Sequence, residues 1–320
     1  GEVPVGERTV RLDEPIEVVE LPFTPPRAGQ FELSVSTDPL PGEIVVDNNV
    51  VTRRIQVIDD FVRLLYVADE PTWEWRFVKE VFHRDQTVGM RGFRTYLASS
   101  DPRVRQSNPL FLSTLIPGRS EFFANDVIFL DDVSSAILTP RFCDLLERFV
   151  RDLGGGLVVM AGPRFGPKPL HDTSIAKMLP VILDPQAPVR DEQSFPMRRT
   201  SRAREFLFMQ LGDSPEENEK AWANLAQVPW YQPVAQTHER AVVLAEHPND
   251  KCNDGTTAQP LIAIRRFGEG EVVFLGFNEM WRLRRMYGET YYRRFWSPLI
   301  DRLGLSHALG PRKRFVPRLD

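Results

Sequence analysis

The clearest pattern of apolar and polar positions in the chain lies at residues 139–163. From Phe142 onward, apolar residues recur three and four positions apart, which predicts a helix with one buried face. Thr139 can cap the start of this helix, and Gly154 can end it, because glycine accepts a positive φ. An unbroken apolar run at 157–160 follows, as is typical of a strand covered on both faces. The stretch therefore predicts one helix–strand unit of a parallel α/β sheet.

Similar units flank this stretch on both sides. Buried strands are predicted at 62–68, 93–98, 126–130 and 157–160, with an edge hairpin of 261–266 and 272–277. Helices are predicted to start at Thr72, at the capping box of Ser214 and near Glu289. Alternating strands and helices imply a parallel sheet with right-handed crossovers. We expect a three-layer α/β/α sandwich over residues 61–305, in which 62–68 and 157–160 are neighbouring strands.

The first sixty residues have a different pattern. Short apolar runs separated by Pro, Gly and Asn turns predict a β-sandwich module, with strands at 9–12, 16–19, 29–36 and 50–57. Sixty residues is short for such a module, which typically takes ~100, so we expect it to be incomplete. Asp47 to Asn49 is interpreted as a turn rather than a calcium loop. Residues 306–320 are expected to form a basic tail.

Composition narrows the function classes. The net charge of -4 gives no general attraction to nucleic acid, and no apolar run reaches the ~18 residues of a membrane span. Cys143 and Cys252 cannot form a disulfide framework or a four-cysteine zinc site. The five histidines show no metal-ligand spacing, and the glycines at 154–156 follow a helix rather than a strand, unlike a phosphate loop. We expect no metal, no cofactor, no nucleic acid partner and no membrane span.

Four segments carry a family resemblance. They are LLYVADEPTWEWRFVKEVFHRD (64–85), DVIFLDDV (126–133), LERFVRDLGGGLVVMAG (146–162) and FGEGEVVFLGFNEMWRLRRMYGETYYRRFW (267–296). Through them, residues 61–305 resemble the class I glutamine amidotransferase-like superfamily, and more closely the glutamine amidotransferase-like domain of bacterial, planctomycete-type membrane proteins. GEIVVDNNVVTRRIQV resembles the end of an immunoglobulin-like module. The resemblance implies a flavodoxin-like sandwich, and an extracytoplasmic place (periplasm or cell envelope) within a larger membrane-anchored protein.

The resemblance does not extend to catalysis. Active members of the family carry a cysteine after the strand that matches 157–160, and a histidine and a glutamate after the strand that matches 272–277. Here residues 161–164 read AGPR and residues 276–279 read GFNE, without the cysteine or the histidine. Nucleophilic acyl transfer needs a thiolate or alkoxide near a base. We therefore expect no glutaminase activity and name no catalytic residue.

The expected binding site lies at the carboxyl ends of the strands, where ligands of open α/β sheets bind. Its candidate residues are Asp69, Glu70, Trp73, Asp131, Asp132, Gly162, Arg164, Asn278 and Glu279. The same side chains could instead cap helices and pack. If they form a site, two hypotheses stay open. One is a non-catalytic binding or scaffold module for a protein or carbohydrate of the cell envelope. The other is a hydrolase that uses Asp69, Asp131 or Glu279 with a metal or a water.

A pair of similar segments adds one structural expectation. TWEWRF follows the first strand of the sheet, and MWRLRR follows the last. We expect them to meet and form a mainly structural cluster, because arginine stacks well on tryptophan. Its members would be Trp73, Trp75, Arg76, Trp281, Arg282 and Arg284, with Glu74 and Glu279 neutralising part of the charge. Loss of the Trp75 side chain would then destabilise the fold by about 3–5 kcal/mol.

Overall fold

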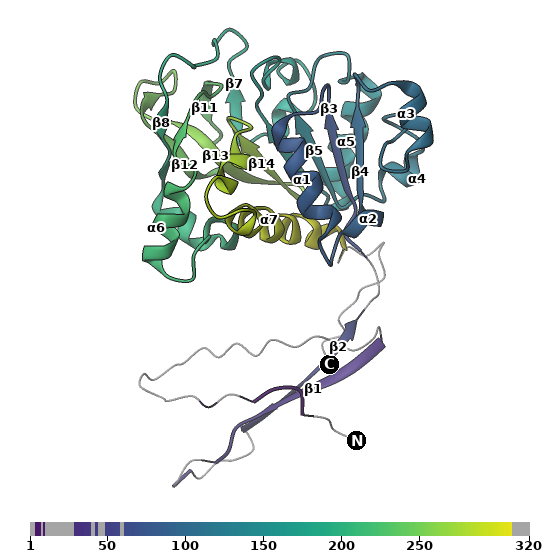
Figure 1. Ribbon diagram of the computed structural model, residues 1–320, viewed down its shortest axis with the longest axis vertical. Coiled ribbons are helices and arrows are strands. Elements are labelled where there is room, and N and C mark those ends of the chain that lie inside the picture. Colours follow the sequence, from purple (N-terminus) through teal and green to yellow (C-terminus); the bar gives the residue numbers. More distant parts are fainter. Residues whose placement is uncertain are drawn as a thin grey trace. The chain divides into compact units, whose positions relative to one another are not determined.

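The computed structural model describes residues 4–7, 9, 29–39, 42–43, 49–57 and 61–308. The chain divides into two compact units, 1–60 and 61–320 (Figure 1). In the first unit, β1 (Gly29–Ser36) pairs antiparallel with β2 (Val50–Val57). The predicted strand at 16–19 lies outside the described residues, and of the predicted strand at 9–12 only Thr9 is described. Asp47 and Asn48 of the predicted turn also lie outside the described residues. The immunoglobulin-like module therefore stays a prediction.

The second unit is a mixed α/β domain built on one eight-stranded sheet. The strand order is β4-β3-β5-β6-β14-β13-β12-β9. The bounds are β3 Leu64–Ala68, β4 Phe93–Leu97, β5 Val127–Asp131, β6 Gly156–Met160, β9 Arg198–Arg199, β12 Val242–Lys251, β13 Ala258–Phe267 and β14 Gly270–Leu275. Strands β4 to β14 in this order run parallel, and β14, β13, β12 and β9 pair antiparallel. The α/β class is confirmed.

Two details of the predicted sheet are wrong. The strands expected as neighbours, β3 and β6, are separated by β5, which pairs with both. The β13–β14 hairpin forms as predicted but lies inside the sheet, because β14 pairs with β6 and β13 pairs with β12. Both errors concern strand order. β3 and β6 are apolar and fully buried, and β13 and β14 are mostly buried, so their sequences do not specify their neighbours.

The predicted helix boundaries agree closely with the structure, because they depend on local contacts. α5 spans Pro140–Leu153; the Thr139 hydroxyl accepts a hydrogen bond from the Phe142 amide at 3.3 Å, and Gly154 has a φ of 76°. α1 (Trp73–His83) begins at Thr72, whose hydroxyl accepts from the Trp75 amide at 3.0 Å. The last helix, α7 (Thr290–Ala308), extends further than predicted, so residues 306–308 are helical rather than part of a tail. Residues 309–320 lie outside the described residues.

The remaining elements are short. The other α-helices are α2 (Gly89–Gly92), α3 (Pro102–Ser107), α4 (Arg119–Phe122) and α6 (Pro215–Ala223). The 3₁₀ helices are η2 (Lys168–Leu170), η3 (Ala176–Met178), η4 (Ser201–Glu205), η5 (Leu207–Met209) and η6 (Met280–Arg284). Two small antiparallel pairs are β7 (Val181–Leu183) with β11 (Val234–Thr237), and β8 (Phe195–Pro196) with β10 (Gln227–Val228). No described helix meets both the length and the apolarity needed to cross a bilayer.

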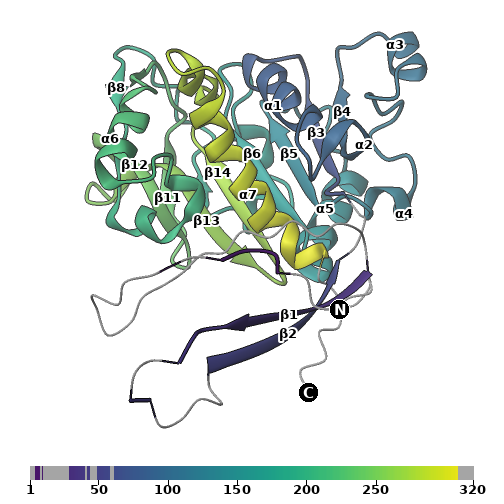
Figure 2. The ribbon, with the colours of Figure 1, turned by 60° about the horizontal axis from the view of Figure 1, so that its bottom comes forward.

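Two hydrophobic clusters cover the two faces of the sheet. On one face, Tyr66, Phe129 and Val158 pack with α1 and α7. On the other, Ile128 and Val159 pack with α5. Figure 2 shows α7 lying along one face of the sheet, across β14 and β6. Alternate side chains of each strand thus enter opposite clusters, and the parallel strands place their carboxyl ends along a common edge.

Candidate functional site

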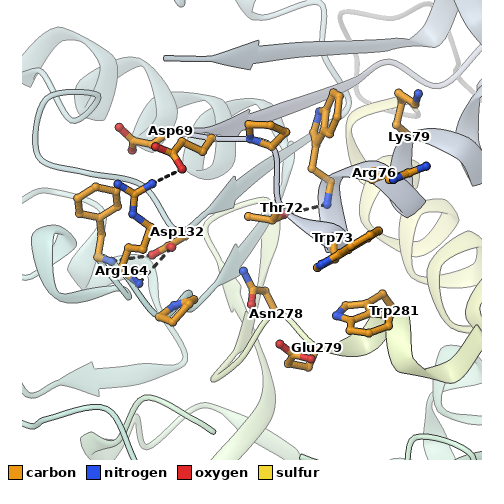
Figure 3. Close-up of a pocket in the computed structure, with 15 residues that line it drawn as sticks. Asp69, Thr72, Trp73, Arg76, Lys79, Asp132, Arg164, Asn278, Glu279 and Trp281 are labelled. Carbon is orange, nitrogen blue, oxygen red and sulfur yellow. Dashed lines mark hydrogen bonds and ion pairs between the residues drawn. The ribbon is translucent and has the colours of Figure 1, made fainter. Parts of the chain in front are cut away.

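A cavity of about 610 Å³ opens at the carboxyl edge of the parallel strands (Figure 3). Seven of the nine candidate residues line it: Asp69, Glu70, Trp73, Asp132, Arg164, Asn278 and Glu279. They come from the segments after β3, β5, β6 and β14 and from the first turn of α1. Asp131 and Gly162 do not line the cavity, but each contacts a residue that does. The structure therefore brings together side chains that are up to about two hundred residues apart in the sequence.

The Asp132 carboxylate organises the loop after β6. It accepts hydrogen bonds from the backbone amides of Arg164 at 3.3 Å, Phe165 at 2.8 Å and Gly166 at 2.9 Å. Successive amides that converge in this way form an anion-binding nest. Asp132 itself has a positive φ of 48°, a conformation that aspartate tolerates better than most residues. Because Asp132 is 6% exposed, its carboxylate mainly fixes the loop.

Gly162 is required by the same arrangement. A Cβ atom at this position would lie 2.0 Å from Cγ of Asp132. No side chain fits there while the Asp132 carboxylate remains in its nest. Gly162 does not line the cavity. It affects the cavity indirectly, because its missing side chain leaves room for the Asp132 carboxylate.

Two further carboxylates on this wall have fixed partners. Asp69 accepts hydrogen bonds from the Ser134 amide at 2.5 Å and from the Ser134 hydroxyl at 2.8 Å. Glu70 forms an ion pair with Arg164, and the Arg164 guanidinium lies 5.3 Å from the ring centre of Phe165. Figure 3 shows Asp69, Asp132 and Arg164 gathered on one side of the cavity. We call Asp69, Glu70, Asp132 and Arg164 the polar wall.

Asp131 is fully buried beside the cavity. Its carboxylate accepts hydrogen bonds from the Tyr66 hydroxyl at 2.8 Å, the Thr72 hydroxyl at 2.6 Å and the Asn278 amide at 3.0 Å. Burial raises the pKa of Asp131 to about 6, against the opposing effect of these three hydrogen bonds. The group links β5 to the segments after β3 and β14, and through Thr72 and Asn278 it contacts two residues of the cavity lining.

The opposite side of the cavity is aromatic. The rings of Trp73 and Trp281 lie 6.0 Å apart between centres, and Phe77 lies 5.9 Å from Trp73 and 6.2 Å from Trp281. Trp73 is 56% exposed. The Arg76 guanidinium lies 5.4 Å from the ring centre of Trp73. Figure 3 shows the two indoles side by side, across the cavity from the polar wall. We call Trp73 and Trp281 the aromatic wall.

The predicted tryptophan–arginine cluster forms only in part. Trp73 and Trp281 meet as expected, although two strands, β5 and β6, separate β3 from β14. Trp75 is half-buried, and its indole nitrogen donates to the Thr95 hydroxyl at 3.0 Å. Glu279 pairs with Arg282 at 2.5 Å, as expected of a neutralising carboxylate. Arg284 lies over Phe77, at 4.1 Å from the ring centre, rather than over a tryptophan.

Glu74 was expected to offset charge in this cluster, and that expectation is wrong. It is fully buried and accepts hydrogen bonds from the Tyr292 hydroxyl at 2.5 Å, the Trp281 amide at 3.0 Å and the Trp296 indole nitrogen at 3.2 Å. Burial raises the pKa of Glu74 to about 8, although these hydrogen bonds act in the opposite direction. One carboxylate therefore joins α1, η6 and α7 directly behind the aromatic wall.

Several lining residues were not among the sequence candidates. Lys79 and Phe165 lack any motif, and Thr72 was identified only as a helix cap. Ser134, which fixes Asp69, follows β5 in a pattern without an esterase elbow. Within the described ranges, no group of three His, Cys, Asp or Glu side chains could hold a metal ion. Both cysteines are buried and free, and burial raises the pKa of each thiol.

Comparisons with known proteins show the fold alone. No protein-family model and no curated protein matches the chain. The structure is similar to the cytoplasmic protein STM3548 from Salmonella typhimurium, with a TM-score of 0.50, 15% identity, and coverage of 75% of this chain and 98% of that one. It is also similar to the cytoplasmic protein STM1381 from Salmonella typhimurium LT2, with a TM-score of 0.50, 14% identity, and coverage of 76% and 99%. The carbohydrate deacetylase Agd3 matches with a TM-score of 0.38, 12% identity, and coverage of 73% and 32%.

Proposed function

We propose that this chain is a non-catalytic binding module of the glutamine amidotransferase-like type, and that its cavity takes a saccharide. The observation that carries the proposal is the aromatic wall of Trp73 and Trp281, which faces the polar wall across one open cavity. Binding sites commonly combine apolar and aromatic surface with a few placed polar groups. A sugar ring has the matching surfaces, because its C–H face is apolar and its rim carries hydroxyls.

The state of the polar groups favours binding over catalysis. Asp69, Asp132 and Glu70 already accept hydrogen bonds or form ion pairs that fix their positions. Among the lining residues only Thr72 carries an aliphatic hydroxyl, and this group donates to Asp131 and accepts from the Trp75 amide. A nucleophile needs an adjacent base, and Thr72 contacts no histidine or lysine in these bonds. Fixed carboxylates and amides are suited to orienting sugar hydroxyls.

One observation favours the hydrolase as a second candidate. Asp131 has a pKa raised to about 6, and carboxyls with raised pKa values serve as general acids in glycoside hydrolysis. Its full burial and its three hydrogen bonds to Tyr66, Thr72 and Asn278 oppose this role in the present conformation. The two candidates differ in outcome, because only the hydrolase changes a bound saccharide.

The test measures the binding of a panel of oligosaccharides to the whole chain, by calorimetry and by tryptophan fluorescence. Trp73→Ala should weaken binding by about tenfold or more, because the loss of an aromatic anchor in a site typically costs over ~1.4 kcal/mol. Tyr287→Ala is the matched control: Tyr287 is 55% exposed, close to the 56% of Trp73, and does not line the cavity. If Trp73→Ala, like the control Tyr287→Ala, binds every saccharide as tightly as the unchanged protein does, the proposal is wrong.

Prolonged incubation separates the two candidates. The binding module should leave every oligosaccharide intact, as judged by chromatography of the products. Cleavage that is lost in Asp131→Asn, with the fold retained by circular dichroism, would establish the hydrolase instead. The extracytoplasmic setting implied by the family resemblance is part of the same proposal. Protease accessibility of the tagged protein on intact native cells would test it.

A further inference from the structure

Four of the seven charged side chains that line the cavity form ion pairs. Glu70 pairs with Arg164, Glu279 pairs with Arg282, and Lys79 pairs with Glu80 at 2.9 Å. Asp69 and Asp132 are held by the uncharged donors described above. These contacts leave one lining side chain to consider, Arg76.

Arg76 has a different environment. It is exposed, it lines the cavity, and its guanidinium lies over the face of Trp73. In the part of the chain that the structure describes, no carboxylate forms an ion pair with it. The guanidinium carbon lies 5.4 Å from the ring centre, which is a cation–π distance and uses none of the N–H groups in an ion pair. Its N–H donors can therefore bind a carboxylate in a bidentate manner.

The two walls thus offer different chemistry to a ligand. The aromatic wall carries the unpaired cation Arg76, and the polar wall carries Asp69 and Asp132, whose negative charges are not balanced by an ion pair. A neutral sugar would leave Arg76 without a partner. An anionic group would be attracted to the aromatic wall and repelled from the polar wall, so the charges would also fix the direction in which the ligand lies.

We propose that the preferred ligand is an acidic saccharide, whose ring packs on Trp73 while its carboxylate is bound by Arg76. The hydroxyls on the far side of the ring then face Asn278 and the polar wall, which can accept and donate hydrogen bonds. This inference rests on the proposed function, since it names the saccharide class for the same cavity. It assigns to Arg76 the selection between acidic and neutral sugars, and to Trp73 the binding of both.

The test compares each acidic sugar with its own neutral form. The probes are tetrasaccharides of polygalacturonate, polymannuronate and hyaluronan, each beside its fully methyl-esterified form, titrated into the whole chain at low salt. At least one acid should bind about 3- to 10-fold more tightly than its ester, the range expected for a partly exposed charge pair. The preference should shrink at high salt, because ions screen exposed charges. Arg76→Gln should abolish the preference, so that the acid and its ester bind this variant equally.

Two variants control for net charge. Lys79→Gln removes a cation from the same cavity rim, but Lys79 already pairs with Glu80, so we expect less than half the effect of Arg76→Gln. Arg141→Gln removes an exposed arginine of α5, on the other face of the sheet, and should leave the preference intact. An equal effect of all three variants would overturn the role of Arg76, because it would show a response to net charge alone.

The outcomes separate this inference from the proposed function. If esters and acids bind equally, and Trp73→Ala weakens both, the saccharide module stands and the preference for acidic sugars is refuted. If acids bind more tightly but Arg76→Gln keeps the difference, the assignment of Arg76 is refuted. If no tetrasaccharide of either form binds at millimolar concentration, both proposals fail.

Discussion

The Glu74→Gln substitution gives the sharpest test of the buried network behind the aromatic wall. Burial favours the neutral form of Glu74, and the hydrogen bonds from Tyr292, Trp281 and Trp296 favour the ionised form. Burial dominates, since the pKa of Glu74 is raised from 4.5 to about 8. A raised carboxyl pKa means that the folded chain binds this proton more tightly than the unfolded chain. Stability from this group therefore falls as the pH rises from about 4.5 to about 8.

The expected change in the free energy of unfolding follows from the width of this pH window. Each pH unit inside it changes the free energy of unfolding by at most ~1.4 kcal/mol, so the whole window amounts to several kcal/mol. Glutamine has no such titration, but its amide group places donors against partners that are themselves donors. We expect the wild type to be more stable than Glu74→Gln at pH 5. The difference in the free energy of unfolding between the two proteins should narrow steadily towards pH 8. The sign of the difference reverses if the buried charge destabilises the wild type by more than the mismatched amide destabilises the variant.

The assay is urea unfolding of both proteins at half-unit steps from pH 5 to pH 9. The comparison of the two proteins cancels the groups that do not interact with Glu74. Asp131 does interact with Glu74, and its own raised pKa acts in the same direction at lower pH. Glu80→Gln, on the same helix, is the control. The hydrogen bond with Lys79 lowers the pKa of Glu80, so its contribution is already complete above pH 5 and the difference should stay flat. A difference that is also flat for Glu74→Gln would refute the dominance of burial.

Three further outcomes are expected. Trp75→Ala should destabilise the fold by about 3 kcal/mol, the lower end of the range expected from the sequence, because the indole is half-buried but bonded to Thr95; a thermal melt checks this, and an unchanged melting temperature would reassign Trp75 as a ligand platform. Gly162→Ala should cost about 1–3 kcal/mol or displace Asp132 from its nest, since the new methyl overlaps its carboxylate; unfolding curves and loop proteolysis check this. Glutamine should not be hydrolysed, and ammonia release above the blank that is lost in Cys143→Ser or Cys252→Ser would contradict the absence of a nucleophile.

The sequence predicted those features that depend on neighbouring residues. Thr139, Thr72 and Gly154 start or end their helices as expected, because a cap is a contact across three or four positions. The strand-end position of most of the cavity lining was also predictable, since parallel strands share a carboxyl edge. Strand order was not, because β3, β5 and β6 are each buried on both faces and carry no signal of their neighbours.

Glu74 shows the same limit within the site. In the sequence it lies in the first turn of a helix, where an acidic residue normally faces water and favours the helix dipole. Its partners Tyr292 and Trp296 lie more than two hundred positions away on α7, and no local pattern links them. Arg76 likewise was expected only to stack on a tryptophan. Among the described residues Arg76 has no carboxylate partner, and this depends on the positions of charges that are distant in the sequence.

The position of β14 has a consequence for how the chain is made. β14 pairs with β6, and roughly 110 residues separate the two strands along the chain. A ribosome adds ~5–20 residues per second, so β14 is synthesised about 5–20 s after β6. During that time the unpaired edge of Leu157–Met160 is open to other growing chains, as exposed apolar edges generally are. A high density of ribosomes on the messenger RNA should therefore favour aggregation of nascent chains. Slower initiation of translation, or a chaperone that covers β6, should raise the yield of folded protein.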